Sequence, residues 1–334
     1  SRSTQAQYRC LAMAGETHMK PATTMVSLVE DYLECRRRLG FALESEERRL
    51  LCFARFADQI GHRGPITEEL ALRWACSSSR ATATTRAGRL KILSPFAKYR
   101  LQFDPATEIA SPGLCGPGHR RLTPHIYSEE EIDALLDTAR RLPAAGSLRP
   151  VTCETVFGLL AATGLRISEA LAFRRSDVDL ERGLLTIRQS KFRKARQVPL
   201  HPTTTEALRA YACNRDKRLP ASTTDTFFVT DRGRPVNYRQ IAYAFARLRA
   251  QLGWQARGGH PHPRIHDLRH SFICRRLIGW YQEGIDVGNA MLVLSTYVGH
   301  TQVTDTFWYI TAIPELMTIA GDRFEHFVQG GNHA

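Results

Sequence analysis

The chain has 334 residues, of which 43% are hydrophobic, enough for packed cores in about two domains. Lysine and arginine outnumber aspartate and glutamate by 46 to 33. The resulting net charge of +13 favours a polyanionic partner such as DNA, although a merely basic cytosolic enzyme would show the same balance. The sequence has no apolar run of about 18 residues, no secretory signal and no C-x-x-C pair among its eight cysteines, which argues against membrane, secreted and zinc-scaffold proteins.

Residues 20–105 are predicted to form a small all-helical domain. Apolar residues recur at helical spacing from Thr23, where Thr23 or Thr24 could cap the helix, and again on one face of the stretch 50–56. A third helix is expected after Thr67, a capping residue that two glutamates follow. Residues 1–19 are polar and patternless, so we expect a disordered leader or a cloning remnant there.

The stretch 80–100 carries cations and no acidic residue, and its apolar positions lie on one helical face. Two interpretations stay open: a solvated basic face, and a helix laid against DNA phosphates. Pro95 predicts a kink or break in this helix. The candidates for DNA contact here are Arg80, Arg86, Arg89 and Lys91.

Residues 106–123 are rich in proline and glycine and are predicted to be a linker between two domains. Arg120 and Arg121 lie in this linker, and they suit a segment that crosses a DNA backbone.

A second domain is expected at 124–334, mainly helical with a small β-hairpin. Ser128 and the glutamates after it predict a capped helix start. The apolar stretch 151–173 predicts a buried helix that breaks at Gly164, which frees the backbone just before Arg166. The segments 184–187 and 197–200 predict paired strands. The turn between them is strongly cationic, with Arg188, Lys191, Arg193, Lys194 and Arg196.

Three motifs of this domain carry chemistry: a T-G-L-R-I-S-E box around Arg166, an H-D-L-R-H box around Arg269, and a G-H pair followed nine residues later by Tyr309. A tyrosine hydroxyl has a pKa of about 10 and is a poor nucleophile without help. Two arginines suit a phosphodiester, because each guanidinium can donate parallel hydrogen bonds to two phosphate oxygens.

In order and local spacing, six residues resemble the constellation of the tyrosine recombinases, the phage integrase family: Arg166, Lys191, His266, Arg269, His300 and Tyr309. A lysine seven residues before V-P-L completes the match of the motifs. The resemblance covers the second domain only. It implies a helical, SAM-like core-binding domain ahead of an α+β catalytic domain, and the two together clamp the DNA duplex.

The resemblance implies transesterification at phosphorus. Tyr309 is expected to attack a DNA phosphate and form a 3′-phosphotyrosyl link. Arg166 and Arg269 are expected to stabilise charge on the non-bridging oxygens, with help from the two histidines of the set. The reaction needs no cofactor, neither ATP nor a metal.

The same resemblance assigns the proton transfers. Lys191 is expected to protonate the departing 5′-oxygen, and His266 is the better candidate to accept the tyrosine proton, with His300 mainly a hydrogen-bond donor. Glu169 and Asp267 are expected to hold an arginine or a histidine in its rotamer, or simply to form helix ion pairs.

His266 and His270 have the four-residue spacing of a zinc pair. The sequence around them lacks the H-E-x-x-H glutamate and an obvious third ligand, so we expect no metal. Arg269 and His300 lie 31 residues apart, an interval longer than is usual in the family, which predicts a helix extension or a loop insertion.

From residue 313 the tail again shows a helical apolar period. It could fold back on its own domain, or pack into a neighbouring protomer of a homotetramer on DNA, as in related recombinases. The implied partner is a specific double-stranded recombination site, without a membrane, and an accessory DNA-bending or directionality protein is compatible with it. The implied location is the cytoplasm, on the nucleoid.

The sequence therefore predicts a site-specific recombinase or integrase that serves mobile-element integration, excision or resolution. Two other classes stay open. One is a type IB topoisomerase or telomere resolvase, which uses the same chemistry. The other is a non-catalytic DNA-binding relative, against which the intact set of six residues argues.

Overall fold

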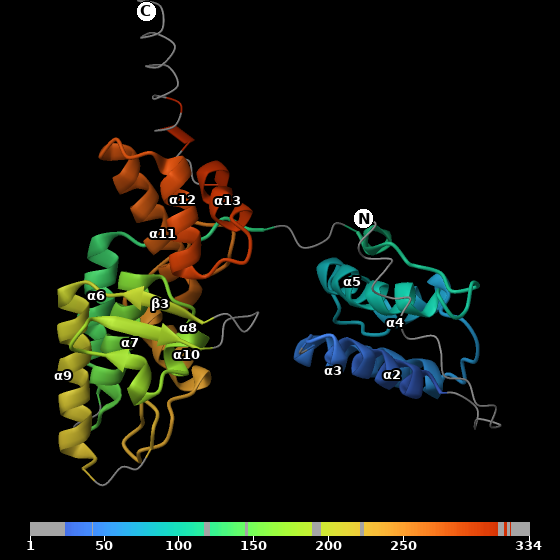
Figure 1. Ribbon diagram of the computed structural model, residues 1–334, viewed down its shortest axis with the longest axis horizontal. Coiled ribbons are helices and arrows are strands. Elements are labelled where there is room, and N and C mark those ends of the chain that lie inside the picture. Colours follow the sequence, from blue (N-terminus) through green and yellow to red (C-terminus); the bar gives the residue numbers. More distant parts are fainter. Residues whose placement is uncertain are drawn as a thin grey trace, which may run out of the picture. The chain divides into compact units, whose positions relative to one another are not determined.

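The computed structural model describes residues 24–41, 43–116, 121–143, 146–188, 195–220 and 224–312, together with 317, 318 and 321. The chain divides into two units, Ser1–Arg121 and Leu122–Ala334 (Figure 1). The predicted leader at 1–19 and almost all of the predicted tail from 313 lie outside the described residues.

The described part of the N-terminal unit is helical. It consists of α2 (Met25–Arg38), α3 (Glu44–Gln59), α4 (Glu68–Ala75), α5 (Ala83–Arg100) and the short 3-10 helix η2 (Pro112–Cys115). Thr24, Thr67 and Thr82 each cap a helix, because their hydroxyls accept a hydrogen bond from the backbone N–H three residues further on. The predicted all-helical fold of this region is confirmed.

α5 continues through Pro95, so the predicted break does not occur. The residues on both sides of the proline, Leu93 and Phe96, are buried in the core of the unit. The packing of this face offsets the backbone hydrogen bond that proline cannot make.

The first part of the predicted linker belongs to the N-terminal unit. Ala110 is buried in the core of this unit, and the backbone N–H of Glu108 donates to the carbonyl of Ile66 at 2.7 Å. Residues 105–116 are therefore held against the helices rather than free.

The second unit, Leu122–Ala334, is built around the long buried helix α7 (Arg149–Thr163). This helix contacts α6 (Glu129–Arg140), α9 (Pro202–Arg218) and α11 (Ile265–Gln282) (Figure 1). We call this unit the catalytic unit below. The other described helices are α8 (Ile167–Leu171), the 3-10 helix η3 (Arg175–Asp177), α10 (Tyr238–Gln251), α12 (Val287–Val298) and α13 (Thr304–Ala312). Ser128 caps α6 in a capping box with Glu131, as its sequence predicts.

A small antiparallel sheet packs on this helical core. It contains β1 (Val178–Asp179), β2 (Leu184–Ile187) and β3 (Arg196–Pro199) in the order β1-β2-β3. The predicted hairpin is β2 with β3, in which Leu185 pairs with Val198, and β1 adds a third strand that the sequence pattern did not predict. The mainly helical fold with a small sheet is thus confirmed.

The long interval between Arg269 and His300 is mostly helical. α11 continues to Gln282, and α12 fills most of the remainder before Gly299. α11, α12 and α13 lie side by side (Figure 1) and share an apolar cluster that includes Met291 and Tyr309. The interval therefore builds the wall against which the tyrosine helix packs.

Candidate active site

Gly164 separates α7 from α8 and so places Arg166. It has a left-handed backbone with φ of 62°, and a Cβ at this position would lie 2.5 Å from the Phe272 ring. Only glycine fits both the conformation and the close contact. The chain therefore turns sharply, and Arg166 is the N-cap residue directly before α8, at the start of a new helix as the sequence predicts.

A buried carboxylate holds Arg166. Glu169 accepts from Arg166 Nη1 at 3.0 Å, and the other guanidinium nitrogen, Nη2, donates to the carbonyl of Gly299 at 2.9 Å. The Arg166 side chain is 31% exposed, whereas that of Glu169 is 5% exposed. These two hydrogen bonds hold the Arg166 guanidinium in place, while part of the side chain stays exposed to solvent.

Arg196, the first residue of β3, binds the same carboxylate. Its two Nη atoms donate to the two Glu169 oxygens at 3.1 and 2.9 Å, and it also donates to the carbonyls of Tyr297 and Val298. Burial raises the pKa of Glu169, but hydrogen bonds and charge from Arg196, and then from Arg166, outweigh it and hold this pKa below its usual value. Glu169 therefore stays ionised and joins β3, α8 and the end of α12.

Arg269 lies deeper, with 2% of its surface exposed. Its Nη1 donates to the carbonyl of Gly164 at 2.6 Å, while Nη2 is buried without a hydrogen-bond partner among the described residues. Burial, followed by the charge of Arg166, lowers the pKa of Arg269 to about 10, so the group is still charged at neutral pH. A buried cationic donor without an acceptor suits an incoming anionic oxygen.

His266 lies in the first turn of α11, where the residue is exposed to solvent on one side while its ring packs edge to face against His270. Desolvation of the ring is the main cause that lowers the pKa of His266 to about 4, and the charges of Arg269 and Arg264 lower it further. Asp267, the next residue, is fully buried and accepts from Arg264 Nη2 at 2.7 Å. Asp267 thus secures the start of α11, and it pairs with Arg264 rather than with a predicted catalytic residue.

Tyr309 on α13 is buried, with 1% of its surface exposed. Its hydroxyl lies 2.5 Å from Nδ1 of His270, and its ring stacks on His300 with centroids 6.4 Å apart and planes at 10°. His300 in turn bonds through Nδ1 to the Thr306 hydroxyl at 2.6 Å. The hydroxyl of the predicted nucleophile is therefore enclosed by the protein.

The structure thus brings five of the six predicted catalytic residues into one connected region. Lys191 lies outside the described residues, as do Arg193 and Lys194 in the same loop and Arg120 in the linker. The described ends of that loop meet where Ile187 of β2 pairs with Arg196 of β3. The loop of Lys191 therefore starts and ends beside the Glu169 carboxylate.

The sequence pattern predicted no individual role for Arg196, beyond its place in the cationic turn, and none for His270 once a metal pair was judged unsupported. Both residues stood in recognised motifs, the cationic turn and the H-D-L-R-H box. Only the packing of β3 against α12, and of α11 against α13, gives them partners in the site.

Among the predicted DNA contacts on the N-terminal unit, Arg80, Lys91 and Arg121 are exposed, and Arg86 is half-buried. Arg89 has an internal role that sequence analysis missed. Its Nη1 donates to the carbonyls of Trp74 and Ala75, each at 3.0 Å, and so caps the C-terminal end of α4.

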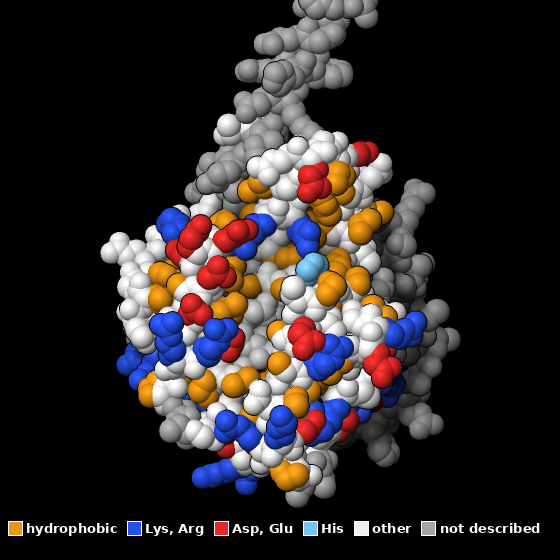
Figure 2. Space-filling model, turned by 90° about the vertical axis from the view of Figure 1, so that its left-hand side faces the viewer, with side chains coloured by type: hydrophobic (Ala, Val, Ile, Leu, Met, Phe, Trp, Pro, Cys, Tyr) orange, Lys and Arg blue, Asp and Glu red, His pale blue; other side chains and the backbone are white. Residues whose placement is uncertain are grey.

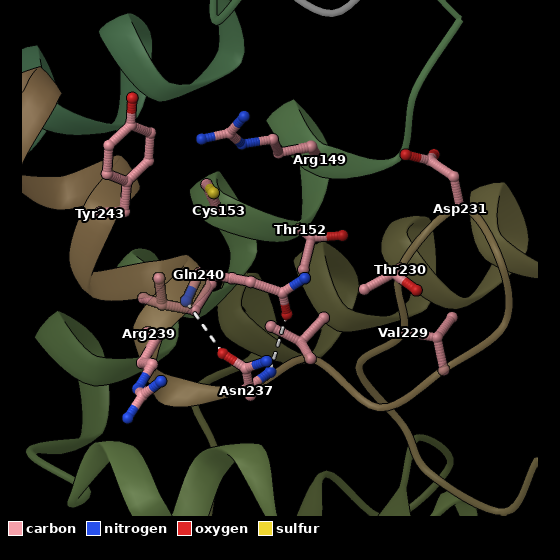
Figure 3. Close-up of a pocket in the computed structure, with 12 residues that line it drawn as sticks. Arg149, Thr152, Cys153, Val229, Thr230, Asp231, Asn237, Arg239, Gln240 and Tyr243 are labelled. Carbon is pink, nitrogen blue, oxygen red and sulfur yellow. Dashed lines mark hydrogen bonds between the residues drawn. The ribbon is translucent and has the colours of Figure 1, made fainter.

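Figure 2 shows one face of the second unit, on which acidic, basic and apolar side chains are mixed without a continuous cationic area. A half-open pocket of about 410 Å³ lies between the start of α7 and the start of α10 and is lined by Arg149, Cys153, Asn237 and Tyr243, among others (Figure 3). No predicted catalytic residue lines this pocket.

The described residues contain no group of three or more His, Cys, Asp or Glu side chains that could hold a metal. No helix in the described part of the chain is long and apolar enough to cross a bilayer.

Comparison with known proteins identifies the family. The phage integrase family model matches residues 126–315. The chain is 40% identical over 309 residues to y4rB of Sinorhizobium fredii, named as a candidate integrase/recombinase, and the match covers 91% of this chain and 98% of the relative. It is 26% identical to tyrosine recombinase XerD of Bradyrhizobium diazoefficiens, over 82% of this chain and 86% of that one.

Solved structures agree at the level of the fold. XerH recombinase bound to its difH substrate in a post-cleavage complex aligns with a TM-score of 0.60 and 16% identity, covering 90% of this chain and 85% of that one. The Tn1549 transposon integrase in complex with a circular-intermediate DNA aligns with a TM-score of 0.64 and 15% identity, covering 90% and 99%. With the family match over more than half its length, the chain belongs to the phage integrase family of tyrosine recombinases, enzymes that break and rejoin DNA.

Proposed function

We propose that this protein is a site-specific recombinase of a mobile element, which cuts and rejoins its DNA site through a 3′-phosphotyrosine at Tyr309. The observation that carries the proposal is the pair of arginines. Arg269 bonds to the Gly164 carbonyl, two residues before Arg166, and its other terminal nitrogen is buried with no acceptor in the described part of the chain. A scissile phosphate between the two guanidinium groups would supply that acceptor.

In this mechanism Arg166 and Arg269 stabilise the charge that builds on the non-bridging oxygens, because both are held in place before DNA arrives. Lys191 donates a proton to the departing 5′-oxygen. His300 supports the tyrosine ring through its stack and assists at the phosphate. The ester keeps the energy of the broken bond, so a second 5′-hydroxyl can rejoin the strand without ATP.

The mobile-element role is supported by the relatives. y4rB and y4rE of Sinorhizobium fredii, at 40% and 36% identity over 91% of this chain, are both named as candidate integrase/recombinases. The Tn1549 integrase, which has the same fold, is a transposon protein.

The proposed partner is a double-stranded recombination site, bound in the cytoplasm on the nucleoid. The N-terminal unit contributes phosphate contacts from Arg80, Arg86, Lys91 and Arg121, with Arg89 limited by its internal bonds. Arg120, Arg193 and Lys194 are proposed as further contacts. The assembly on DNA is a homotetramer joined by exchange of the tail from residue 313, and an accessory DNA-bending protein would act on the same site.

Covalent capture tests the proposal. Protein is incubated with fragmented DNA from its source without metal or ATP and denatured, and protein-linked DNA is sequenced, with Tyr309→Phe as the matched control. We expect adducts at one recurrent site that are absent from the variant. DNA binding without adducts, even on nicked substrates that prevent religation, would support a non-catalytic relative. Relaxation of supercoiled DNA at many sites would support a topoisomerase.

A further inference from the structure

The second histidine of the H-D-L-R-H box has no role in the set of six residues that the family resemblance assigns. His270 follows Arg269 directly and lies one helical turn after His266 on α11. It is 7% exposed, and a buried imidazole needs hydrogen-bond partners to offset its desolvation.

His270 forms a hydrogen bond with Tyr309, whose hydroxyl lies 2.5 Å from Nδ1 of the imidazole. The two rings pack with centroids 5.5 Å apart, and the centroid of the Trp308 ring lies 6.4 Å from that of the imidazole. Because α11 and α13 are packed helices of one core, this contact is set by tertiary structure rather than by a flexible surface side chain. His270 thus touches the atom that would become the nucleophile.

We propose that His270 accepts the proton of Tyr309 when the tyrosine attacks DNA, and holds the hydroxyl in place until then. This inference rests on the proposed function, in which Tyr309 is the nucleophile. In the step, the Tyr309 O–H bond breaks and its proton passes to Nδ1 of His270. The tyrosine oxygen bonds to phosphorus as the bond from phosphorus to the 5′-oxygen breaks, and Lys191 supplies the proton for that oxygen. In the reverse step the proton returns from His270 to the tyrosine.

His266 is the competing acceptor, and its position favours it less. It lies at the exposed start of α11. Its ring packs edge to face against the ring of His270, with the two centroids 4.7 Å apart. The lowered pKa of His266, about 4, makes it a weaker base than an ordinary imidazole. The other titratable and charged groups around the contact are Arg269 on α11 and His300, which stacks on the tyrosine.

Single-turnover cleavage by two matched variants tests the proposal. The substrate is the captured site, nicked near the scissile phosphate so that cleavage cannot reverse. His270→Asn keeps an oxygen acceptor close to the position of Nδ1 but cannot take up a proton. His266→Asn makes the same change one turn earlier. Cleavage rates are measured at about pH 7 and pH 9.5, with melting temperature and DNA affinity as checks of folding and binding.

At about pH 7 we expect His270→Asn to cleave about 10² to 10⁴-fold more slowly than wild type, with its DNA affinity kept. The ratio of wild-type to variant rate should shrink at least about tenfold by about pH 9.5, because more of the tyrosine is then ionised without a base. His266→Asn should show no such recovery, because its loss concerns the phosphate.

Two results would overturn the proposal: a His270→Asn rate within about threefold of wild type, or a pH recovery seen with His266→Asn alone. If His270→Asn fails to fold, His270→Gln is measured in its place, and a deficit in that variant that does not change with pH also counts against a proton role. Adducts that persist in Tyr309→Phe would instead refute the proposed nucleophile, so the two failures are distinguishable.

Discussion

The two sides of the active site are held by different kinds of contact. On the arginine side, Glu169 makes ion pairs with Arg166 and Arg196, and backbone carbonyls complete the network. On the tyrosine side, the Tyr309 hydroxyl bonds to the imidazole of His270, and the Tyr309 ring packs against His300 and Trp308. Removing one partner of a buried ion pair costs about 3 to 5 kcal/mol, whereas an ordinary hydrogen bond contributes about 1 kcal/mol.

This difference distinguishes the arginine side, which is already in place, from the tyrosine side, where groups must move before DNA is cut. The cationic side is preorganised and needs no rearrangement to receive a phosphate. The nucleophile is buried, at 1% exposed, so the groups that cover its hydroxyl must move aside before a phosphate can reach it. Four predictions test this contrast.

The largest effect is expected at Arg269, the most deeply buried cation of the site. Arg269→Ala should lower the single-turnover cleavage rate about 10² to 10³-fold, because it removes a donor aimed at the developing charge. Arg269→Lys should recover little, since lysine cannot reproduce the fork that bonds Gly164 and phosphate together. The single-turnover assay on nicked DNA measures both variants. If the cleavage rate of Arg269→Ala were less than about tenfold below that of wild type, Arg269 would have no major part in stabilising the transition state.

Glu169 should matter most for stability. Glu169→Gln leaves Arg196, whose side chain is 11% exposed, without its carboxylate and should lower the free energy of unfolding by about 3 kcal/mol. Chemical denaturation gives the value. Glu181→Gln, at an exposed position, is the matched control and should change stability by less than about 0.5 kcal/mol. Equal changes in the free energy of unfolding for the two variants would mean that the ion pairs of Glu169 do not stabilise the arginine side of the site.

Gly164 tests the turn that places Arg166. Gly164→Ala should cost about 1 to 3 kcal/mol, because φ is 62° and the new methyl group would meet Phe272. Gly279→Ala is the control, since this glycine lies inside α11 with nothing within 4 Å of the added carbon. It should be neutral or stabilise by up to about 1 kcal/mol. Melting temperatures of both variants decide whether glycine is required only at the turn.

The smallest effect concerns pH. The lowered pKa of His266 means that the folded protein resists protonation of this ring more than the unfolded chain does. Stability should therefore fall as the pH drops from about 6.5 towards 4. The melting temperature of His266→Asn should fall less steeply with decreasing pH over that window than the melting temperature of wild type. Parallel curves would show that the ring is not desolvated in solution.

Much of this molecule follows from its sequence. Local rules were sufficient for the helix starts at Thr24, Thr67 and Ser128, because capping and amphipathic period act within a few residues. The break at Gly164 and the β2–β3 hairpin follow from backbone preference in the same way. Of the two outcomes expected at Pro95, a kink or a break, the break does not occur, because the buried residues on both sides of the proline hold the helix in the core.

Motif spacing likewise sufficed to predict the family, because the order of the catalytic residues is written along the chain. Which side chain touches which could not be predicted, because Arg196 and Glu169 are 27 residues apart and His270 and Tyr309 are 39 apart. Such contacts depend on how helices and strands pack, which no local pattern records. The sequence by itself therefore determined the chemistry available, and only the tertiary structure decided that the arginines are fastened and that the tyrosine is enclosed beside His270.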